Sequence, residues 1–324
     1  MDQTRRDIFK AFGVTMGVFL LHGCDRKSTT QELFIWEGYA LGADSSIQLY
    51  GNDKFEFDAV IQDAVELIKR LEKIFSLYDP TSEISRLNEA GKIDHASPEM
   101  IDLINASKEM SRITKGAFDI TVQPLWNFYD RYFAGDRSSD FDVEVSNILP
   151  LIGSDKIHIE GSSVSFERKG MAISSNGIAQ GYITDQVLSL LNDRGYNHAL
   201  VDIGEYGATG AQYDGSPWRI GLLDPFDQIS VADVVDFHKG GLATSGGYGT
   251  VFEDSGENHH IFNPATGLST RSYASVTVLA DDATTADALS TAFSAMTMDD
   301  IKRVSELVHA KVRLTMRDGE VVWI

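Results

Sequence analysis

Apolar residues recur every three or four positions between residues 57 and 78, with acids and lysines between them. This spacing places the apolar side chains on one face of a helix. Residues 98–113 and 178–194 are also predicted to be helices, and the latter ends at Gly195. Residues 124–150 are aromatic and acidic and show no clear period, so no element is predicted there.

Short apolar or alternating runs between turn residues predict the strands of the chain. They cover residues 32–36, 46–50, 156–159, 164–167, 171–174, 198–203 and 218–223. The last quarter predicts a strand at 275–280, a helix at 284–296, a further helix and a hairpin turned by Asp318-Gly319. Because helices and strands mix without a regular alternation, we predict an α+β, or mixed α/β, fold in one large domain.

Composition adds a constraint on the ligand. The chain has 324 residues, 43% of them hydrophobic, which is enough to bury a substantial core. The net charge is -20, and residues 1–23 hold three basic and two acidic side chains, so the remainder carries -21. A surface this acidic repels phosphate backbones, which argues against nucleic-acid binding. An anionic ligand needs a metal ion or helix N-termini to bridge it to such a protein.

The N-terminus is predicted to be a targeting segment. Two adjacent arginines precede an apolar run at residues 11–21, and Cys24 follows. This order is typical of a twin-arginine export signal joined to a lipoprotein cleavage box. We therefore predict a signal peptide at 1–23, a tether at 24–31, and a periplasmic protein anchored to the inner membrane by a lipid on Cys24. Cys24 is the only cysteine, so no disulfide framework or thiol metal site is expected.

Asp287 and Thr291 are the candidate metal ligands. They lie four residues apart in the predicted helix 284–296, so the carboxylate and the hydroxyl share one face. Both are hard oxygen donors that suit Mg²⁺ or Ca²⁺. The alternative is a polar helix start, in which the acid offsets the helix dipole and Thr291 bonds to the backbone.

Tyr78 and Asp119 are candidates for ligand contacts. Tyr78 is predicted at the end of the first long helix, where its aromatic face can stack on a flat ring, although the spacing alone favours core packing. Asp119 follows Phe118 in an apolar setting, so its carboxylate must be paired, hydrogen-bonded or functional. The alternative is an aspartate that only stabilises a turn.

Two further segments carry candidate chemistry. A turn containing Gly177 leads into a predicted helix, which can direct N–H groups at an anion and a carbonyl at a metal, although packing explains the spacing of Gly177 and Gly181 as well. His259 and His260 are adjacent, and on a strand they point to opposite faces, which argues against a shared zinc ion. One histidine is a candidate acid or base; the alternative is an ordinary half-buried residue.

Six short segments carry a family resemblance when they are taken together. They are Ser-Leu-Tyr with Ser-Glu-Ile-Ser-Arg-Leu-Asn (76–88), Gly-Ala-Phe-Asp (116–119), Gly-Ile-Ala-Gln-Gly-Tyr (177–182), Ala-Thr-Ser-Gly (243–246), His-Ile-Phe-Asn-Pro-Ala-Thr-Gly (260–267) and Asp-Ala-Leu-Ser-Thr (287–291). In this order they resemble the ApbE family, the FAD:protein FMN transferases, over nearly all of residues 35–324. The export signal and the third segment also resemble the NosX branch, which is linked to flavinylation of a nitrous-oxide-respiration regulator.

The resemblance implies a T-fold-related flavin transferase domain at residues 32–324 and a set of roles. Asp287, Thr291 and the Gly177 carbonyl match the family's Mg²⁺ ligands. The positions implied for the flavin site are Leu41, Tyr78, Ala117, Phe118, Asp119, Ser174, Gln180 and Phe262. We expect His260, with Asp287, to orient or deprotonate the acceptor hydroxyl. A segment at residues 205–209 that faintly resembles a flavin acceptor site is interpreted as structural.

Four positions depart from the family pattern. Ser174 stands where an Asp is usual, Gln180 where a Lys is usual, and Asn263 and Ala265 where the family has Asp and Arg. Two cations that would meet the diphosphate are thereby lost, together with two anions, so the local charge roughly balances. Gln180 still offers a hydrogen bond, weaker than one assisted by charge.

The resemblance implies transfer of the FMN half of FAD to a Thr or Ser hydroxyl of an extracytoplasmic flavoprotein, with release of AMP and dependence on Mg²⁺. The implied acceptor has a Ser/Thr-Gly-Ala-Thr type of site, as in NosR-like or NqrC/RnfG-like proteins. Two alternatives are a Mg²⁺-dependent pyrophosphatase that splits FAD into FMN and AMP, and a non-catalytic FAD-binding lipoprotein.

Overall fold

The computed structural model describes residues 31–324, apart from residues 41 and 136, and Gln31–Ile324 form one compact unit. The strands are β1 (Glu32–Ala40), β2 (Ala43–Gly51), β3 (Lys92–Ile93), β4 (Ile157–Glu160), β5 (Ser163–Phe166), β6 (Ala199–Asp202), β7 (Tyr206–Ala208), β8 (Trp218–Leu223), β9 (Val231–Phe237), β10 (Gly240–Ser245), β11 (Tyr273–Ala280), β12 (Lys311–Met316) and β13 (Val321–Trp323). The α-helices are α1 (Lys54–Phe75), α2 (Glu83–Ala90), α3 (Pro98–Ile113), α4 (Gln123–Phe133), α5 (Phe141–Ile148), α6 (Ala179–Asp193), α7 (Ala283–Phe293) and α8 (Met298–Val308). Short 3-10 helices cover Ile120–Val122, Leu149–Leu151, Ser154–Lys156 and Gly247–Gly249.

One sheet organises the described residues. Its strand order is β1-β2-β6-β7-β10-β11-β12-β13, and every pair of neighbours is antiparallel. Alternate residues of β6 enter different cores: Val201 packs with the helices, whereas Leu200 packs with the β8–β9 hairpin. Since side chains of a strand alternate between faces, the sheet is covered on both sides. The predicted mixed α/β fold is confirmed.

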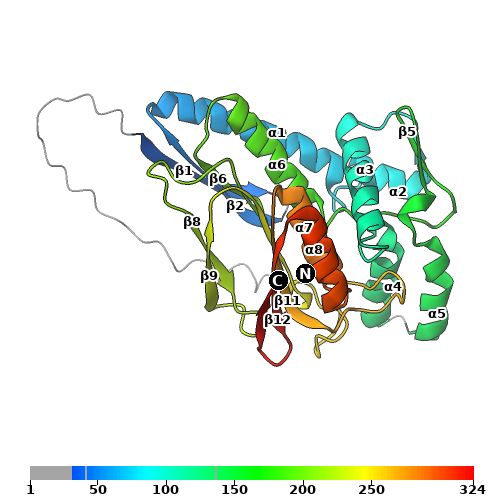
Figure 1. The fold of residues 1–324 in the computed structure, drawn as a ribbon. Helices are drawn as coiled ribbons and strands as arrows, with labels where there is room; N and C mark the ends of the chain where they lie inside the picture. Colours follow the sequence, from blue (N-terminus) through cyan, green and yellow to red (C-terminus); the bar gives the residue numbers. More distant parts are fainter. Residues whose placement is uncertain (1–30, 41, 136) are drawn as a thin grey trace, which may run out of the picture. The chain divides into compact units, whose positions relative to one another are not determined.

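The helices of the larger core lie along one face of the sheet. Figure 1 shows α1 and α6 running side by side, with α7 next to α6. The apolar residues of α1 that recur at helical spacing, including Ile61, Ile68 and Leu71, are buried in this core. Six of the described α-helices begin with a Ser, Thr or Asp whose side chain accepts a backbone N–H, as in Ser82 before α2, so their starts are fixed locally.

A second, aromatic cluster anchors the loop that follows the 3-10 helix at Gly247–Gly249. Phe128, Tyr129 and Phe262 are buried in it, and the ring centroids of Tyr129 and Phe262 lie 4.8 Å apart. The Tyr129 hydroxyl donates a hydrogen bond to the Gly267 carbonyl at 3.0 Å. Two isolated β-bridges, Val251 with His259 and Phe262 with Ser269, also hold this segment. Residues 259–269, held by α4 and by these bridges, form the anchored loop.

The start of α7 is clamped between α6 and β10. A Cβ atom on Gly181 of α6 would lie 2.2 Å from the Ala283 carbonyl oxygen, and one on Gly241 of β10 would lie 2.3 Å from the Ala283 nitrogen. Real Cβ atoms do not approach that closely, so both positions need glycine. Asp185 on α6 also accepts the backbone N–H groups of Ala283 at 2.9 Å and Thr284 at 2.8 Å. These contacts fix the helix that carries Asp287 and Thr291.

Most predicted elements are confirmed. The helix at 98–113 and the strand at 218–223 match α3 and β8, and the predicted order of strand, helix, helix and hairpin matches β11, α7, α8 and β12–β13. Strands β1 and β2 run longer than predicted, since their pairing extends to Ala40 and Ala43 at the turn.

Three predictions were wrong. Residues 171–174 form no strand: Ile173 instead exchanges two hydrogen bonds with the side chain of Asn88, and Ser174 donates to the Ile120 carbonyl. Residues 124–150 contain α4 and α5, and Leu125, Phe128 and Tyr129 of α4 lie at helical spacing and are buried in the aromatic cluster. The long helix ends at Phe75, before Asp79, so Tyr78 lies three residues beyond it.

None of the helices in the described part of the chain combines the length and the hydropathy needed to cross a membrane.

Asp185→Asn is expected to lower the free energy of unfolding by about 1–3 kcal/mol, because a buried acceptor of two backbone N–H groups becomes a weaker one. Chemical denaturation of the full chain measures the change. Asp193→Asn is the matched control, since Asp193 lies exposed on the same helix and a surface change costs less than about 0.5 kcal/mol. Equal stability of both variants would show that the Asp185 contact does not hold α7.

Candidate active site

A cleft of about 1100 Å³ gathers most of the predicted site residues. Its walls come from the end of α1, residues 117–122, the start of α6, the β6–β7 turn, the end of β10, the anchored loop, and α7. The predicted residues that line it are Tyr78, Ala117, Phe118, Asp119, Ser174, Gly177, Gln180, His260, Phe262, Asp287 and Thr291. Leu41 lies outside the described residues; its neighbours Gly42 and Ala43 line the cleft.

The three predicted metal donors lie together. Asp287 is 3% exposed, and its Oδ2 atom accepts the Gly181 N–H at 3.0 Å. A Cβ atom on Gly177 would lie 3.0 Å from Thr291 Oγ1, so these two residues are in contact. Thr291 Oγ1 also lies 3.3 Å from Ser245 Oγ. Asp287, Thr291 and Gly177 therefore line the same cleft, with Thr291 in contact with Gly177.

This donor set fits a hard divalent cation. Oxygen ligands of mixed type are those that Mg²⁺ and Ca²⁺ take in proteins, and Mg²⁺ is held by only one or two carboxylates plus substrate phosphates and water. Across residues 31–40, 42–135 and 137–324, no three or more His, Cys, Asp or Glu side chains are grouped to hold a metal ion. The fit thus depends on Thr291 and a carbonyl beside Asp287, not on a carboxylate cluster.

Burial acts strongly on the carboxylates of this region. Removal of Asp287 from water raises its pKa to about 7, although the Gly181 N–H opposes the shift. Burial also raises the pKa of Glu205 well above its usual range, and the charge of Asp287 adds to the effect. A cation beside these groups would favour their ionised forms.

The other end of the cleft is aromatic and open. Tyr78 is 82% exposed, which excludes the core-packing alternative for this residue. Phe118 is buried beneath the cleft surface, and Ala117 lies next to it. An exposed ring beside an apolar floor offers the surfaces between which a flat heterocycle stacks.

Asp119 has the structural role that was the alternative to ligand binding. Its Oδ1 atom accepts the backbone N–H and the hydroxyl of Thr121, at 2.9 and 2.6 Å, and its Oδ2 atom accepts the Ser154 N–H at 2.8 Å. The carboxylate thereby caps the 3-10 helix at Ile120–Val122. It still lines the cleft, so a ligand contact from its edge stays a prediction.

Of the four positions that depart from the family pattern, two line the cleft and two do not. Ser174 and Gln180 line the cleft. The Gln180 amide packs closely on Gly204: a Cβ atom on Gly204 would lie 2.2 Å from Gln180 Nε2. Asn263 lines a different hollow, and Ala265 is not among the cleft residues. The loss of charge at positions 263 and 265 therefore does not change the charge of the described cleft wall.

His260 lines the cleft, and one of its ring nitrogens is held by the backbone. Its Nδ1 atom lies 3.1 Å from the Thr250 carbonyl, which can only accept, so Nδ1 carries the proton in the neutral ring and Nε2 keeps its lone pair. Burial lowers the pKa of His260, so the neutral form is present at pH 7. His259 is 5% exposed and its ring nitrogens contact the Thr270 carbonyl and the Ile261 N–H, so it is structural. The two histidines lie beside an isolated bridge, not on a continuous strand.

Several residues that line the cleft were not predicted, among them three charged ones. Glu205 lies buried on the β6–β7 turn, and Lys69 and Lys73 extend from exposed positions of α1. The lysines are the basic side chains other than His260 among the described residues that line the cleft. Their four-residue spacing on one helical face was the available signal. The sequence held no comparable signal for Glu205, whose burial depends on strand pairing.

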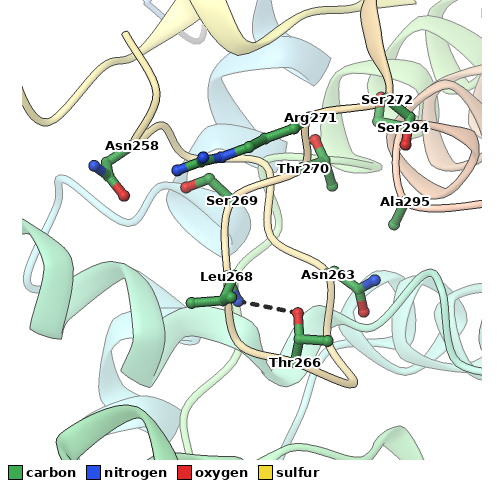
Figure 2. Close-up of a pocket in the computed structure, with 10 residues that line it drawn as sticks. All are labelled: Asn258, Asn263, Thr266, Leu268, Ser269, Thr270, Arg271, Ser272, Ser294 and Ala295. Carbon is green, nitrogen blue, oxygen red and sulfur yellow. Dashed lines mark hydrogen bonds between the residues drawn. The ribbon is translucent and has the colours of Figure 1, made fainter. Parts of the chain in front are cut away.

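A second, smaller hollow lies against the same anchored loop. Figure 2 shows its lining, which includes Asn258, Asn263 and Arg271; its volume is about 380 Å³. None of the residues predicted for metal or flavin binding lines it. Arg271 already forms an ion pair with Glu257, with 3.3 Å between nitrogen and oxygen. The cleft, not this hollow, is the candidate active site.

Known proteins with the same architecture were found by sequence and by structure. A curated FAD:protein FMN transferase of Vibrio cholerae serotype O1 is 29% identical over 289 residues, which cover 86% of this chain and 85% of that protein. The ApbE protein of Thermotoga maritima superposes with a TM-score of 0.78 at 28% identity, covering 90% of this chain and 96% of that one. The flavin transferase ApbE of Vibrio cholerae gives 0.77 at 26% identity, covering 91% and 97%.

The family model that matches is that of the ApbE family, and it spans residues 41–314. The match includes all six segments on which the resemblance was based. It also spans every residue that lines the cleft. The chain therefore belongs to the ApbE family.

Proposed function

We propose that the protein is an FAD:protein FMN transferase, which moves the FMN half of FAD to a Ser or Thr hydroxyl of an acceptor flavoprotein and releases AMP. The observation that carries the proposal is the meeting of Asp287, Thr291 and Gly177 in a cleft whose other end is aromatic and open. Curated relatives that match most of this chain have the name FAD:protein FMN transferase.

The cleft provides for both parts of the substrate. The exposed ring of Tyr78 and the apolar surface over Phe118 suit the isoalloxazine ring. The diphosphate then lies toward Asp287 and Thr291, where charge must be neutralised. Since the chain beyond residue 23 carries -21, a diphosphate needs a cation to bind there.

Asp287, Thr291 and the Gly177 carbonyl are proposed to hold Mg²⁺. When bound, the ion supplies positive charge to the diphosphate oxygens, including the one that leaves with AMP. Gly181 contributes by fixing one oxygen of Asp287 through its N–H, which leaves the other oxygen for the ion. Thr291 is oriented by its contact with Ser245.

His260 is proposed as the general base. Its Nε2 atom accepts the proton of the acceptor hydroxyl as the hydroxyl oxygen forms a bond to the FMN phosphorus. The bond between that phosphorus and the bridging oxygen breaks, and the electron pair leaves with AMP. The products are a phosphoester of FMN on the acceptor, AMP, and a proton on His260. Gln180 can donate a hydrogen bond to the diphosphate in the place where a charged Lys is usual.

The acceptor is proposed to be an extracytoplasmic protein with a Ser/Thr-Gly-Ala-Thr type of site, because the arginine pair, the apolar run and Cys24 are typical of a twin-arginine signal with a lipoprotein cleavage box. A lipid on Cys24 would then hold the enzyme at the periplasmic side of the inner membrane. These features of the N-terminus lie outside the described residues.

Asp287→Ala is expected to abolish FMN transfer, because the metal loses its carboxylate ligand. The full chain is incubated with FAD, Mg²⁺ and an acceptor domain bearing a Ser/Thr-Gly-Ala-Thr site, and the intact mass of the acceptor is measured together with released AMP. The wild type should yield an acceptor heavier by one FMN, with one AMP for each.

Asp185→Asn would be a poor control, because Asp185 binds the first N–H groups of α7. Asp193→Asn is used instead, and this variant should transfer FMN as the wild type does. AMP and free FMN without a modified acceptor would favour a pyrophosphatase. Intact FAD that stays bound would favour a carrier. The acceptor must first be shown to be modified by another family member. If the wild type then gives either of these two results, the proposal is contradicted.

His260→Asn is expected to lower kcat about 10²- to 10⁴-fold, the usual contribution of a positioned base. The matched control is His198→Asn, since His198 also contacts a backbone carbonyl, that of Ala211 at 2.8 Å, but does not line the cleft. Wild-type kcat in the His260 variant would show that another group takes the proton.

The pH profile gives a separate test of His260. Because burial lowers its pKa below the usual 6.5, its neutral form persists to a lower pH than that of a free histidine. At saturating Mg²⁺, kcat of the wild type should stay level down to pH 6.5 and fall only below it. The descending limb should disappear in His260→Asn. A limb that persists in this variant would assign the proton to a different group.

A further inference from the structure

Glu205 is an acidic residue of the cleft to which neither its motif nor its position in the sequence assigned a role. It follows the turn between β6 and β7, is 9% exposed, and lines the cleft. Its Oε2 atom accepts the Thr244 N–H at 3.3 Å, a long hydrogen bond for a buried carboxylate. No ion pair involves Glu205 in the described residues.

The neighbours of Glu205 are the neighbours of the metal donors. On one side, Gly204 packs on Gln180, and the next residue, Gly181, donates its N–H to Asp287. On the other side, Thr244 donates to Glu205, and the next residue, Ser245, contacts Thr291. Glu205 is thus enclosed by the same two segments, the start of α6 and the end of β10, that orient Asp287 and Thr291.

The charges around Glu205 make its burial costly without a cation. Asp287 is the acidic group that acts on it most strongly, and Asp202 adds to the repulsion. Asp119, by contrast, is compensated by hydrogen bonds from Thr121 and Ser154. Buried carboxylates with few donors are normally paired or coordinated to a metal.

We propose that Glu205 is a second carboxylate of the metal centre, which stabilises the hard divalent cation held by Asp287, Thr291 and the Gly177 carbonyl. The inference rests on the metal site of the proposed function and adds to it a positioning residue. Glu205 acts on the ion and not on FAD or the acceptor, so its effect belongs to cation affinity.

The test is Mn²⁺ affinity, measured by electron paramagnetic resonance on the full chain without FAD. Glu205→Gln is expected to weaken Mn²⁺ binding about 10- to 100-fold, the usual effect of removing an acidic partner of a metal site. Asp202→Asn is the matched control: Asp202 is three residues away and accepts the Gly204 N–H, but does not line the cleft. This variant should bind Mn²⁺ as the wild type does. Asp287→Ala should bind none.

Stability separates a metal role from a structural one. In metal-free buffer, Glu205→Gln should unfold at the same temperature as the wild type or higher, since it removes repulsion with Asp287. Added Mn²⁺ should then raise its unfolding temperature less than that of the wild type. Glu205→Asp keeps the charge and should recover part of the affinity, which tests the proposal even if the glutamine variant folds poorly.

Mn²⁺ affinity of Glu205→Gln within twofold of the wild type would overturn the proposal, as would an equal loss in Asp202→Asn. So would Mn²⁺ binding to the wild type that survives Asp287→Ala. Acceptor flavinylation is scored separately. If the wild type binds Mn²⁺ through Glu205 but modifies no acceptor, the role of Glu205 is supported and the transferase proposal is contradicted. If the wild type transfers FMN normally and Glu205→Gln binds Mn²⁺ as tightly as the wild type, the transferase proposal is supported and the role of Glu205 is contradicted.

Discussion

The site depends on the close approach of α7 to α6 and β10. Gly181 and Gly241 have no room for a Cβ atom against Ala283, and Asp185 binds the first backbone N–H groups of α7. A helix held so closely can move little. Asp287 and Thr291, one turn apart, are therefore delivered to the same point beside Gly177 without any flexible segment between them. Metal chemistry needs such preorganisation, because ligands that must first be ordered bind more weakly.

Two buried aspartates show how hydrogen bonding separates structure from chemistry. Asp119 accepts three hydrogen bonds from its own and a neighbouring segment, so its charge is satisfied by the protein. The carboxylate of Asp287 accepts one hydrogen bond, from the Gly181 N–H. It is deeply buried, and burial raises its pKa to about 7. A carboxylate in the second situation is stable as an anion only near a cation. The molecule thus keeps one acid for the fold and another for a ligand.

Much of this was predictable from the sequence, and the exceptions have physical causes. Periodic segments such as α3, and strands bounded by turns such as β8, were found because their side chains repeat with the period of the element. The aromatic helices α4 and α5 are short, and they were missed although Leu125, Phe128 and Tyr129 of α4 do follow helical spacing. The proposed metal ligands Asp287 and Thr291 could be paired from the sequence because they lie four residues apart on one helix. Glu205 had no such signal, because it reaches the same cleft only through the pairing of β6, β7 and β10. The role of Asp119 was left open, since no pattern shows that Ser154, 35 residues away, completes its hydrogen bonds.

The most direct test of this account is anomalous diffraction from crystals of the protein grown with Mn²⁺ and FAD. The predicted result is one Mn²⁺ peak bounded by an Asp287 carboxylate oxygen, Thr291 Oγ1 and the Gly177 carbonyl, in contact with the FAD diphosphate, with the flavin ring against Tyr78. A peak elsewhere, or FAD bound with its diphosphate away from Asp287, would contradict the assignment of this cleft as the centre of FMN transfer.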